Sequence, residues 1–295
     1  MTVDLIVNPA SGPVGRVVSR EGRLEFVSEL LRAADVREIR PTQTARTGDA
    51  TRAALAAVER GTDLVLVWGG DGTINEVAGV LVGQQAPLGI IAGGSGNGLA
   101  RGLGLPLDVR EAVKVAVHGR RRAIDTGHVA GRTFLNLAGV GFDAAVAARV
   151  NTANLTRGLR PYVTGVLHEW RTFPTHRFSL TMDDQPTQEI ASHLVVVCNG
   201  QQYGHGAQVA PQASFDDGWL DVVAVPNITT SRILRHGWRL FDGTLPHVPG
   251  VFTARARRIV VSQDTPLPVH LDGEVVSPAP TRTFEVRPHS LIVKA

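Results

Sequence analysis

The chain has 295 residues, of which 43% are hydrophobic, 19% are charged and one is a cysteine, and its formal net charge is +3. This length is enough for one large or two ordinary domains, each with a full core, and a single cysteine excludes an internal disulfide. No apolar run approaches the ~20 residues that cross a bilayer, so we expect no membrane-spanning segment.

Up to about residue 124, strand and helix patterns alternate, which is typical of a parallel sheet covered by helices. The expected strands are Val3–Val7, Val36–Arg40, Asp63–Val67 and Leu88–Ala92. The expected helices are Arg20–Ala33, Asp49–Glu59, Thr73–Leu81, Asn97–Leu103 and one that runs from an Asp108 cap to about Val117. We therefore predict an α/β domain over residues 1–124.

After residue 124, short β-rich runs separated by turn residues indicate a mostly antiparallel β domain over residues 125–287. The runs are Ala123–Val129, Thr133–Leu137, Phe178–Met182, Leu194–Val197, Leu220–Val225, Arg258–Val261, Val269–Leu271 and Thr283–Val286. A helical insert from about Phe142 to Thr172 and a helix at Ser231–Phe241 interrupt them. The last run, Ser290–Val293, could belong to either domain, so residues 288–295 are a candidate final strand of the first.

Two glycine-rich turns follow neighbouring strands of the first domain: Gly69-Gly70-Asp71-Gly72-Thr73 and Gly93-Gly94-Ser95-Gly96-Asn97. Each lies between an apolar strand and the start of a helix, where glycines permit positive φ and close approach of the backbone to a ligand. Free N–H groups at a helix N-terminus form an anion site. Two such turns predict a polyphosphate between neighbouring strand ends, which points to a nucleotide.

Several polar side chains accompany these turns. Asp71 would repel a phosphate, so we expect it to act through Mg²⁺, directly or through water, or else to form an Asx turn or helix cap. Asn75 either contacts the nucleotide or caps the helix. Ser95 and Asn97 either donate to the ligand or are favoured by the turn conformation alone. Asn8, Ser11 and Gly12 after the first strand, with Thr44 after the second, open on the same sheet edge.

A third group of acids lies in the second domain. His270-Leu271-Asp272-Gly273-Glu274 places two acids across a glycine directly after a strand. This is either a solvated hairpin or, beside a triphosphate, the general base that phosphoryl transfer needs near the acceptor hydroxyl. Asp216-Asp217 forms a turn before the next strand or contributes Asp217 to a metal site, and Asp125 lies at the domain junction. Cys198 is expected to be buried and inert.

Taken together, the chain resembles the diacylglycerol kinase catalytic-domain family, which includes bacterial lipid kinases, sphingosine kinases and ceramide kinase. The matching stretches are ordered along the chain: Asn8-Pro9-Ala10-Ser11-Gly12, Gly69 to Val77, Gly94 to Ala100, Val140-Gly141-Phe142-Asp143, Asp216 to Asp221 and Leu271-Asp272-Gly273-Glu274. The resemblance implies an N-terminal α/β nucleotide domain of the NAD kinase type, a C-terminal antiparallel β-sandwich with a helical insert, and an active site in the cleft. It also implies ATP and Mg²⁺ as co-substrates and a diacylglycerol-like lipid hydroxyl as acceptor.

The resemblance also assigns roles by position. Asp272 matches the general base of the family. The nucleotide-contacting positions are Asn8, Pro9, Ala10, Ser11, Gly12, Thr44, Gly69, Gly70, Asp71, Gly72, Thr73, Asn75, Ser95, Gly96, Asn97 and Glu274. Asp71 and Asp125 match acids of a magnesium–water network. Ser214, Asp217 and Trp219 match a structural metal site, in which Asp217 gives a carboxylate and the other two give carbonyls.

Two departures bear on the substrate. Gly98 stands where bacterial diacylglycerol kinases carry an acid, and Ala147 stands where sphingosine kinases carry the acid that holds the sphingoid amine, with Asp143 offset from it. The Ala147 departure argues against a sphingosine acceptor. The alternatives to a diacylglycerol-like acceptor are a sphingoid or ceramide-type kinase, a soluble NAD kinase-like enzyme with the same glycine turns, and a non-catalytic nucleotide sensor that keeps these turns. The Leu271-Asp272-Gly273-Glu274 motif argues against an NAD kinase.

The acceptor side suggests contact with lipid. Val163, Val166, Leu167 and Trp170 either line an acyl slot or pack internally. The mixture of arginine and apolar residues over 232–241 is typical of an interfacial helix or of a helix packed on the domain. We expect a cytoplasmic protein without a signal peptide that touches the membrane surface transiently and binds no nucleic acid. The oligomeric state stays open, with a homodimer among the alternatives.

Overall fold

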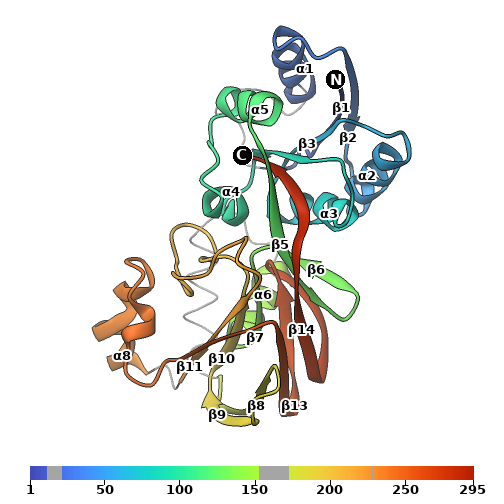
Figure 1. Ribbon diagram of the computed structural model, residues 1–295. Helices are drawn as coiled ribbons and strands as arrows, with labels where there is room; N and C mark the ends of the chain where they lie inside the picture. The colour runs from blue at the N-terminus through green and yellow to red at the C-terminus, as the bar shows by residue number, and fades with distance from the viewer. Residues whose placement is uncertain (12–21, 153–172, 227–228) are drawn as a thin grey trace. The chain divides into compact units, whose positions relative to one another are not determined.

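The computed structural model describes residues 1–11, 22–152, 173–226 and 229–295 (Figure 1). The chain forms two compact units, one of residues 1–125 with 289–295 and the other of residues 126–288. None of the helices among these residues is both long and apolar enough to cross a bilayer. Strands β5 (Arg121–Val129) and β14 (Glu274–Lys294) each run from one unit into the other.

The first unit is built on a parallel sheet with the strand order β4-β3-β1-β2. The end of β14 pairs in parallel with β4, with Val293 opposite Leu88. The strands are β1 (Thr2–Val7), β2 (Glu38–Gln43), β3 (Leu64–Gly69) and β4 (Leu88–Ala92). The helices are α1 (Arg23–Ala33), α2 (Asp49–Glu59), α3 (Asp71–Leu81), α4 (Gly98–Gly102) and α5 (Val109–His118).

Helices cover both faces of this sheet, which explains why its central strands are continuously apolar. On one face α1 and α5 pack against Leu5 of β1 and Leu66 of β3. On the other face lie the small buried side chains of α2 and the buried side chains of α3, among them Ala54 and Ile74. Asp108 caps α5 as expected, because its carboxylate accepts the backbone N–H groups of the first turn.

Several predicted boundaries of this unit shift by one to three residues, and two of these shifts have a clear structural cause. The second strand lies at Glu38–Gln43 rather than Val36–Arg40, because its register is fixed by pairing with β1, with Ile39 opposite Val3. Helix α3 starts at Asp71, two residues earlier than expected, because Gly70 is already its N-cap.

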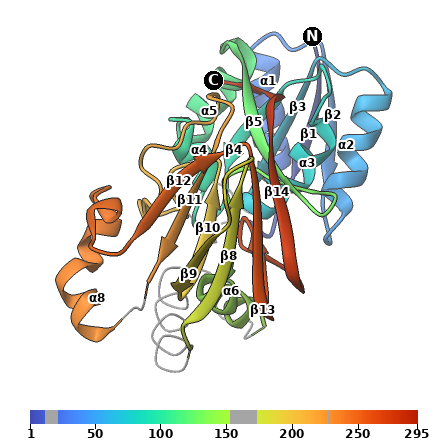
Figure 2. The same cartoon turned by 60° about the horizontal axis from the view of Figure 1, so that its bottom comes forward.

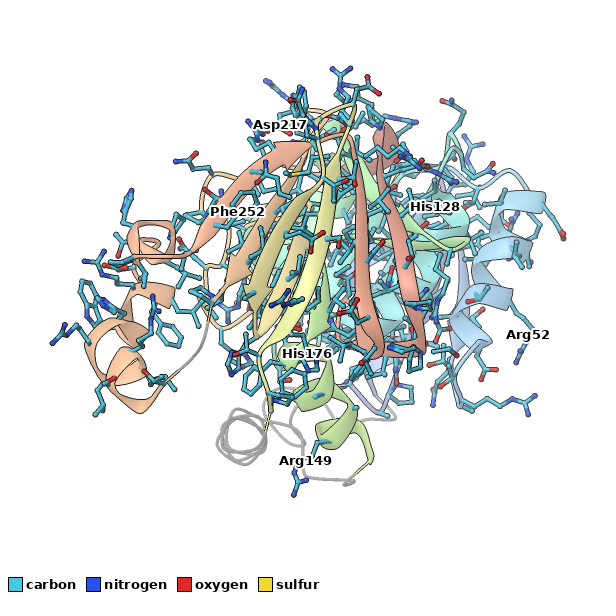
Figure 3. The ribbon with its side chains drawn as sticks, turned by 90° about the horizontal axis from the view of Figure 1, so that it is seen from below. Arg52, His128, Arg149, His176, Asp217 and Phe252 are labelled. Atoms are coloured by element: carbon cyan, nitrogen blue, oxygen red, sulfur yellow. The ribbon has the colours of Figure 1, made fainter. Side chains whose placement is uncertain are left out.

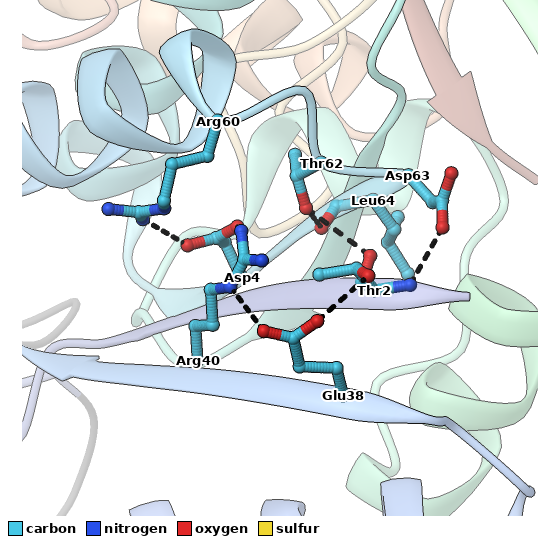
Figure 4. A network of polar contacts seen from close by, with 8 residues as sticks. All are labelled: Thr2, Asp4, Glu38, Arg40, Arg60, Thr62, Asp63 and Leu64. Atoms are coloured by element: carbon cyan, nitrogen blue, oxygen red, sulfur yellow. Dashed lines mark hydrogen bonds and ion pairs between the residues drawn. The ribbon is translucent and has the colours of Figure 1, made fainter.

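A polar network ties together the amino ends of β1, β2 and β3 (Figure 4). The backbone N–H of Thr2 donates to Asp63 Oδ2 over 2.7 Å. Asp4, which is only 2% exposed, forms ion pairs with Arg60 and with Arg40, the latter over 3.9 Å between Nη1 and Oδ2. These contacts lie at the amino edge of the sheet, opposite the carboxyl edge at which open α/β sheets bind ligands.

The second unit is antiparallel. One run of strands has the order β12-β11-β10-β7-β13-β14, while β8 pairs with β13 and with β9, and β6 pairs with β5. The remaining strands are β6 (Arg132–Phe134), β7 (Leu137–Gly141), β8 (His176–Met182), β9 (Gln188–Ser192), β10 (Leu194–Cys198), β11 (Leu220–Val225), β12 (Phe252–Ala256) and β13 (Arg258–Leu271). Figure 2 shows β10, β11 and β12 side by side.

Strand β13 joins two expected runs into one. Its first half pairs with β8 and its last residues pair with β7. Its register with β14 shifts between Ser262 and Val269. Such an irregularity bends a strand, so β13 can pair with both strands and close the sandwich. The core inside contains Phe134 and Phe284, whose rings meet edge to face at 6.3 Å. Cys198 is fully buried, and burial raises the pKa of its thiol, as expected of an inert residue.

The helical parts of the second unit differ from the expected lengths. Helix α6 covers Phe142–Thr152, and the rest of the predicted insert, including Val163, Val166, Leu167 and Trp170, lies outside the described residues. The predicted helix Ser231–Phe241 is divided at Gly237 into α8 (Thr230–His236) and the 3₁₀ helix η1 (Gly237–Leu240). Gly237 favours such a break because a glycine lowers helix stability. A second 3₁₀ helix, η2, covers Leu245–His247.

Candidate active site

Four loops of the first unit lie at the carboxyl ends of neighbouring parallel strands. Thr44 follows β2 and donates its backbone N–H to Val7 O over 2.9 Å, and Asn8 follows β1 and donates to Trp68 O over 2.9 Å. The Gly93 N–H donates to Gly69 O over 2.8 Å and joins the two glycine-rich turns after β3 and β4. The structure thus brings the predicted nucleotide loops to one sheet edge, where ligands of open α/β sheets bind.

The loop after β1 is fastened to the start of α3. Asn8 donates from Nδ2 to Thr73 Oγ1 over 2.8 Å, and its Oδ1 accepts the Ala10 N–H over 2.9 Å. Ser11 is buried, and its Oγ accepts the N–H of Gly70 over 3.1 Å. Pro9 lies between these contacts in the same turn, and Gly12 lies outside the described residues. Asn8 and Ser11 therefore fix the geometry of the first glycine turn.

The two glycine turns need their glycines for close packing against each other. A Cβ on Gly94 would lie 2.9 Å from the Cα of Gly70, and one on Gly69 would lie 2.6 Å from Thr73 Cβ. The glycines of the two turns have no positive φ, so it is their small size that the packing requires. The residue with positive φ is Asn97, at 53°. Its side chain closes its own turn, with Oδ1 accepting the Gly94 N–H over 2.8 Å.

Asp71 acts as a helix cap for the next turn along the chain. Its Oδ2 accepts the Asn97 N–H over 2.9 Å, and its carboxylate also accepts the N–H groups of Gly98 and Leu99 at the start of α4. Burial raises the pKa of Asp71, and these hydrogen bonds oppose that rise. Gly96 packs against the same carboxylate, since a Cβ there would lie 3.1 Å from Oδ2.

The start of α3 lies at this edge, and its N-cap residue makes no side-chain cap. Its N-cap, Gly70, carries no side chain, and the neighbouring Gly72 and Ser95 are exposed. First-turn N–H groups without a capping side chain can donate to an anion. Asn75 is half-buried in the second turn of α3, while Glu76 serves α2, because its Oε2 accepts the Gly48 N–H over 3.0 Å.

In the second unit, Asp272 lies in a two-residue hairpin between β13 and β14. Asp272 and Gly273 have φ of 49° and 86°, the left-handed pair typical of a type I′ turn. The carboxylate of Asp272 accepts three backbone N–H groups of the segment that leads into β7: Oδ2 accepts from Leu135 over 2.6 Å, and Oδ1 from Asn136 and Leu137, each over 2.9 Å. The hairpin interpretation is thus right, and its first acid is held rigidly rather than solvated.

A buried polar group behind this turn was missed from the sequence. His270 Nε2 lies 3.1 Å from Asp143 Oδ2, which also accepts the Tyr203 hydroxyl over 2.8 Å. His270 Nδ1 accepts the Gly273 N–H over 3.2 Å, so Nε2 carries the proton toward Asp143. Gly139 leaves the necessary space, because a Cβ there would lie 1.8 Å from Asp143 Oδ2. Both Asp143 and His270 fall within the quoted motifs, but Tyr203 has no comparable signal.

The remaining predicted residues have structural partners. Fully buried Asp125 accepts the His289 N–H over 2.7 Å, which holds β14 where it enters the first unit. Asp217 Oδ1 accepts the Trp219 N–H over 3.1 Å, and Oδ2 pairs with Arg255. Ser214 donates to the neighbouring Asp216 over 2.8 Å. Asp217 thus forms the turn that was one alternative, and its role as a metal ligand stays a prediction.

Two other acids complete this picture. Exposed Glu274 forms an ion pair with Arg132 over 2.9 Å. Asp221 lies 3.4 Å from Arg255 Nε, but burial raises the pKa of Asp221 to about 6. Across the part of the chain that the structure describes, three or more histidine, cysteine or acidic side chains do not gather into a group that could hold a metal.

Comparison with known proteins identifies both halves of the chain. The family model of the diacylglycerol kinase catalytic domain matches residues 2–129. The model described as the YegS C-terminal NAD kinase beta sandwich-like domain matches residues 136–295. These matches confirm the predicted fold class, an α/β nucleotide-type domain followed by a β-sandwich.

Individual proteins agree with the family models. A diacylglycerol kinase of Mycobacterium tuberculosis is 32% identical over 96% of this chain and 92% of its own. A probable lipid kinase YegS-like protein of Chromohalobacter salexigens is 34% identical over 77% of this chain and 74% of its own. The crystal structure of a putative diacylglycerol kinase from Bacillus anthracis is 26% identical, with a TM-score of 0.78 over 99% of this chain and 96% of that one. The chain therefore belongs to the diacylglycerol kinase catalytic-domain family and is a lipid kinase.

Proposed function

We propose that this lipid kinase transfers the γ-phosphoryl group of ATP to the hydroxyl of a diacylglycerol-like lipid. The observation that carries the proposal is the Asp272 carboxylate, which three backbone N–H groups fix in one orientation on a tight turn. Three such donors hold the carboxylate in one orientation. Membership of the family supplies the class of acceptor.

The phosphates are proposed to bind at the start of α3. Support comes from the missing side-chain cap there and from exposed Gly72 and Ser95, which leave room for an anion. Asn8 and Ser11 would act by holding the turn in place rather than through their own contact with the ligand, because their side-chain atoms already bond Thr73 and Gly70. Thr44, Asn75 and Asn97 are proposed to line the rest of the nucleotide site.

Asp272 is proposed to accept the proton of the lipid hydroxyl. The hydroxyl oxygen forms a bond to the γ-phosphorus, the bond from that phosphorus to the β–γ bridging oxygen breaks, and ADP leaves. Transition states of phosphoryl transfer are loose, so positioning of the acceptor matters more than a strong base. A carboxylate whose direction is fixed by three hydrogen bonds fits this requirement.

Magnesium is proposed as the metal that neutralises the phosphates of bound ATP. Among the described residues no three-carboxylate group could cage a metal by itself, which fits an ion that is bound largely through phosphates and water. Asp71 fits an indirect role through water, because its Oδ2 already accepts the Asn97 N–H. The parts assigned to Asp125 and to the Ser214, Asp217 and Trp219 set stay predictions.

Incubation of the protein with radiolabelled ATP, Mg²⁺ and a panel of acceptors tests this proposal. The panel contains diacylglycerol, sphingosine, ceramide, phosphatidylglycerol and NAD. We expect label chiefly in phosphatidic acid, the product from diacylglycerol. Label chiefly in another lipid would replace the proposed acceptor, and label in NAD alone or in none of the compounds would contradict the proposed reaction.

A further inference from the structure

Exposed large apolar side chains gather in one short segment of the second unit. Leu234 is 80% exposed, Phe241 is 61% exposed, Trp238 is 55% exposed and Ile233 is 37% exposed. The other exposed large apolar side chains of the described residues, Met1, Leu55 and Leu107, are scattered in the first unit. Single exposed residues of this kind are ordinary, whereas a cluster indicates a binding surface.

The fold holds this segment with its apolar side chains turned outward. Thr229 caps α8 by accepting the Arg232 N–H over 3.3 Å, and Leu240 faces inward against a cluster of buried side chains beside β10 and β11. The Gln208 N–H donates to Leu240 O over 2.6 Å and anchors the end of η1. Figure 3 shows side chains projecting from this segment away from the sheet. The break at Gly237 thus leaves an anchored, outward-facing apolar surface.

The same surface is strongly basic. Arg232, Arg235 and Arg239 lie in it, and the Arg239 guanidinium lies 5.2 Å from the centre of the Trp238 ring. Burial first, and then the charges of these three arginines, lower the pKa of His236. The indole N–H of Trp238 donates to Arg235 O over 3.1 Å, so the ring can leave water without an unpaired donor.

We propose that residues 232–241 form a docking surface for an anionic lipid bilayer. A bilayer accepts apolar side chains below its headgroups while arginines contact anionic headgroups, which is the combination that this surface offers. A second copy of the chain is a poorer occupant, because a symmetric contact would place like-charged arginines against each other. The inference goes beyond the phosphoryl-transfer reaction and does not depend on which hydroxyl is phosphorylated.

Sedimentation of the full chain with vesicles tests the proposal. Vesicles of phosphatidylcholine are compared with vesicles in which half of the lipid is phosphatidylglycerol. Neutralising two charges with Arg235→Gln/Arg239→Gln should weaken binding to the anionic vesicles about fivefold for each arginine. Leu234→Ser/Phe241→Ser should weaken the same binding at least about tenfold, since both side chains are exposed and their loss leaves the core intact.

The matched control is Leu55→Ser/Leu107→Ser, which removes two apolar side chains that are 48% and 41% exposed elsewhere on the protein. The proposal is supported if this control keeps vesicle binding while both variants of the docking surface lose it. Equal loss of binding in the control, wild-type binding by both variants of the docking surface, or no binding of the wild-type protein overturns it. A change in oligomeric state by light scattering without a change in vesicle binding also overturns it, in favour of self-association. Vesicle binding needs no turnover, so its failure is distinguishable from failure of the proposed reaction.

Discussion

Asp272→Asn should change both the stability of the turn and the proposed catalysis. The hydrogen bonds of the carboxylate allow the effect on stability to be estimated. The amide keeps one oxygen and replaces the other with a donor. The least costly orientation keeps the oxygen on Asn136 and Leu137 and turns the new NH₂ group toward the Leu135 N–H. One charge-assisted bond is lost and the remaining two become neutral, so we expect the free energy of unfolding to fall by about 3 kcal/mol. Asparagine tolerates the φ of 49°, so backbone strain adds little.

The effect on catalysis is separate from this loss of stability. Removal of the proton acceptor should lower turnover about 10²–10⁴-fold while ATP binding is unchanged, because the nucleotide loops belong to the other unit. Denaturant unfolding, a nucleotide-binding assay and transfer of label to a short-chain diacylglycerol should be measured at a temperature where both proteins are folded. Wild-type turnover would refute Asp272 as the base, and wild-type stability would refute the reasoning about its three amide donors.

Four further variants test other parts of the site and fold. Gly94→Ala should lower the free energy of unfolding by about 1–3 kcal/mol, because the new Cβ would meet backbone atoms. Gly72→Ala places its Cβ in open space, so the free energy of unfolding should change by no more than about 0.5 kcal/mol. Gly72→Ala should still weaken ATP binding, measured by direct titration. His270→Gln loosens the turn that carries the base, so turnover should fall about tenfold to a hundredfold with the KM for ATP unchanged; an altered KM would contradict a positioning role. Burial, and then the charge of His176, lower the pKa of His193, so the unfolded chain takes up this proton at a higher pH than the folded chain. Wild-type stability should therefore fall as the pH drops below about 6.5, and His193→Gln should reduce that fall in urea unfolding curves; identical pH profiles would contradict this.

The sequence predicts the parallel core well because its signal is local. The run Leu64-Val65-Leu66-Val67 is apolar on both faces, and both faces are covered by helices in the structure. Boundaries fail where pairing overrides local pattern: β13 continues through polar Gln263 and Asp264, so two expected strands are one. The direction of the last strand depends on its pairing of Val293 with Leu88, which no local pattern encodes.

In the candidate site, too, features set by local sequence could be predicted and those set by tertiary contacts could not. Placement of the glycine turns at strand ends could be predicted from the chain order, but the partners of their acids could not. Asp71 and Glu76 cap α4 and α2 rather than their own helix, and such contacts depend on the tertiary fold. His270 and Asp143 are 127 residues apart and meet only because β13 pairs with β7. No short-range spacing in the sequence therefore predicts their contact.

Binding of the ATP phosphates at the uncapped start of α3 underlies everything proposed for catalysis. A crystal structure of the full chain with Mg²⁺ and a non-hydrolysable ATP analogue tests this most directly. We expect phosphate oxygens within hydrogen-bond distance of the Gly72 and Thr73 N–H groups. An ordered triphosphate that leaves both of these amides without contact would contradict the proposed site.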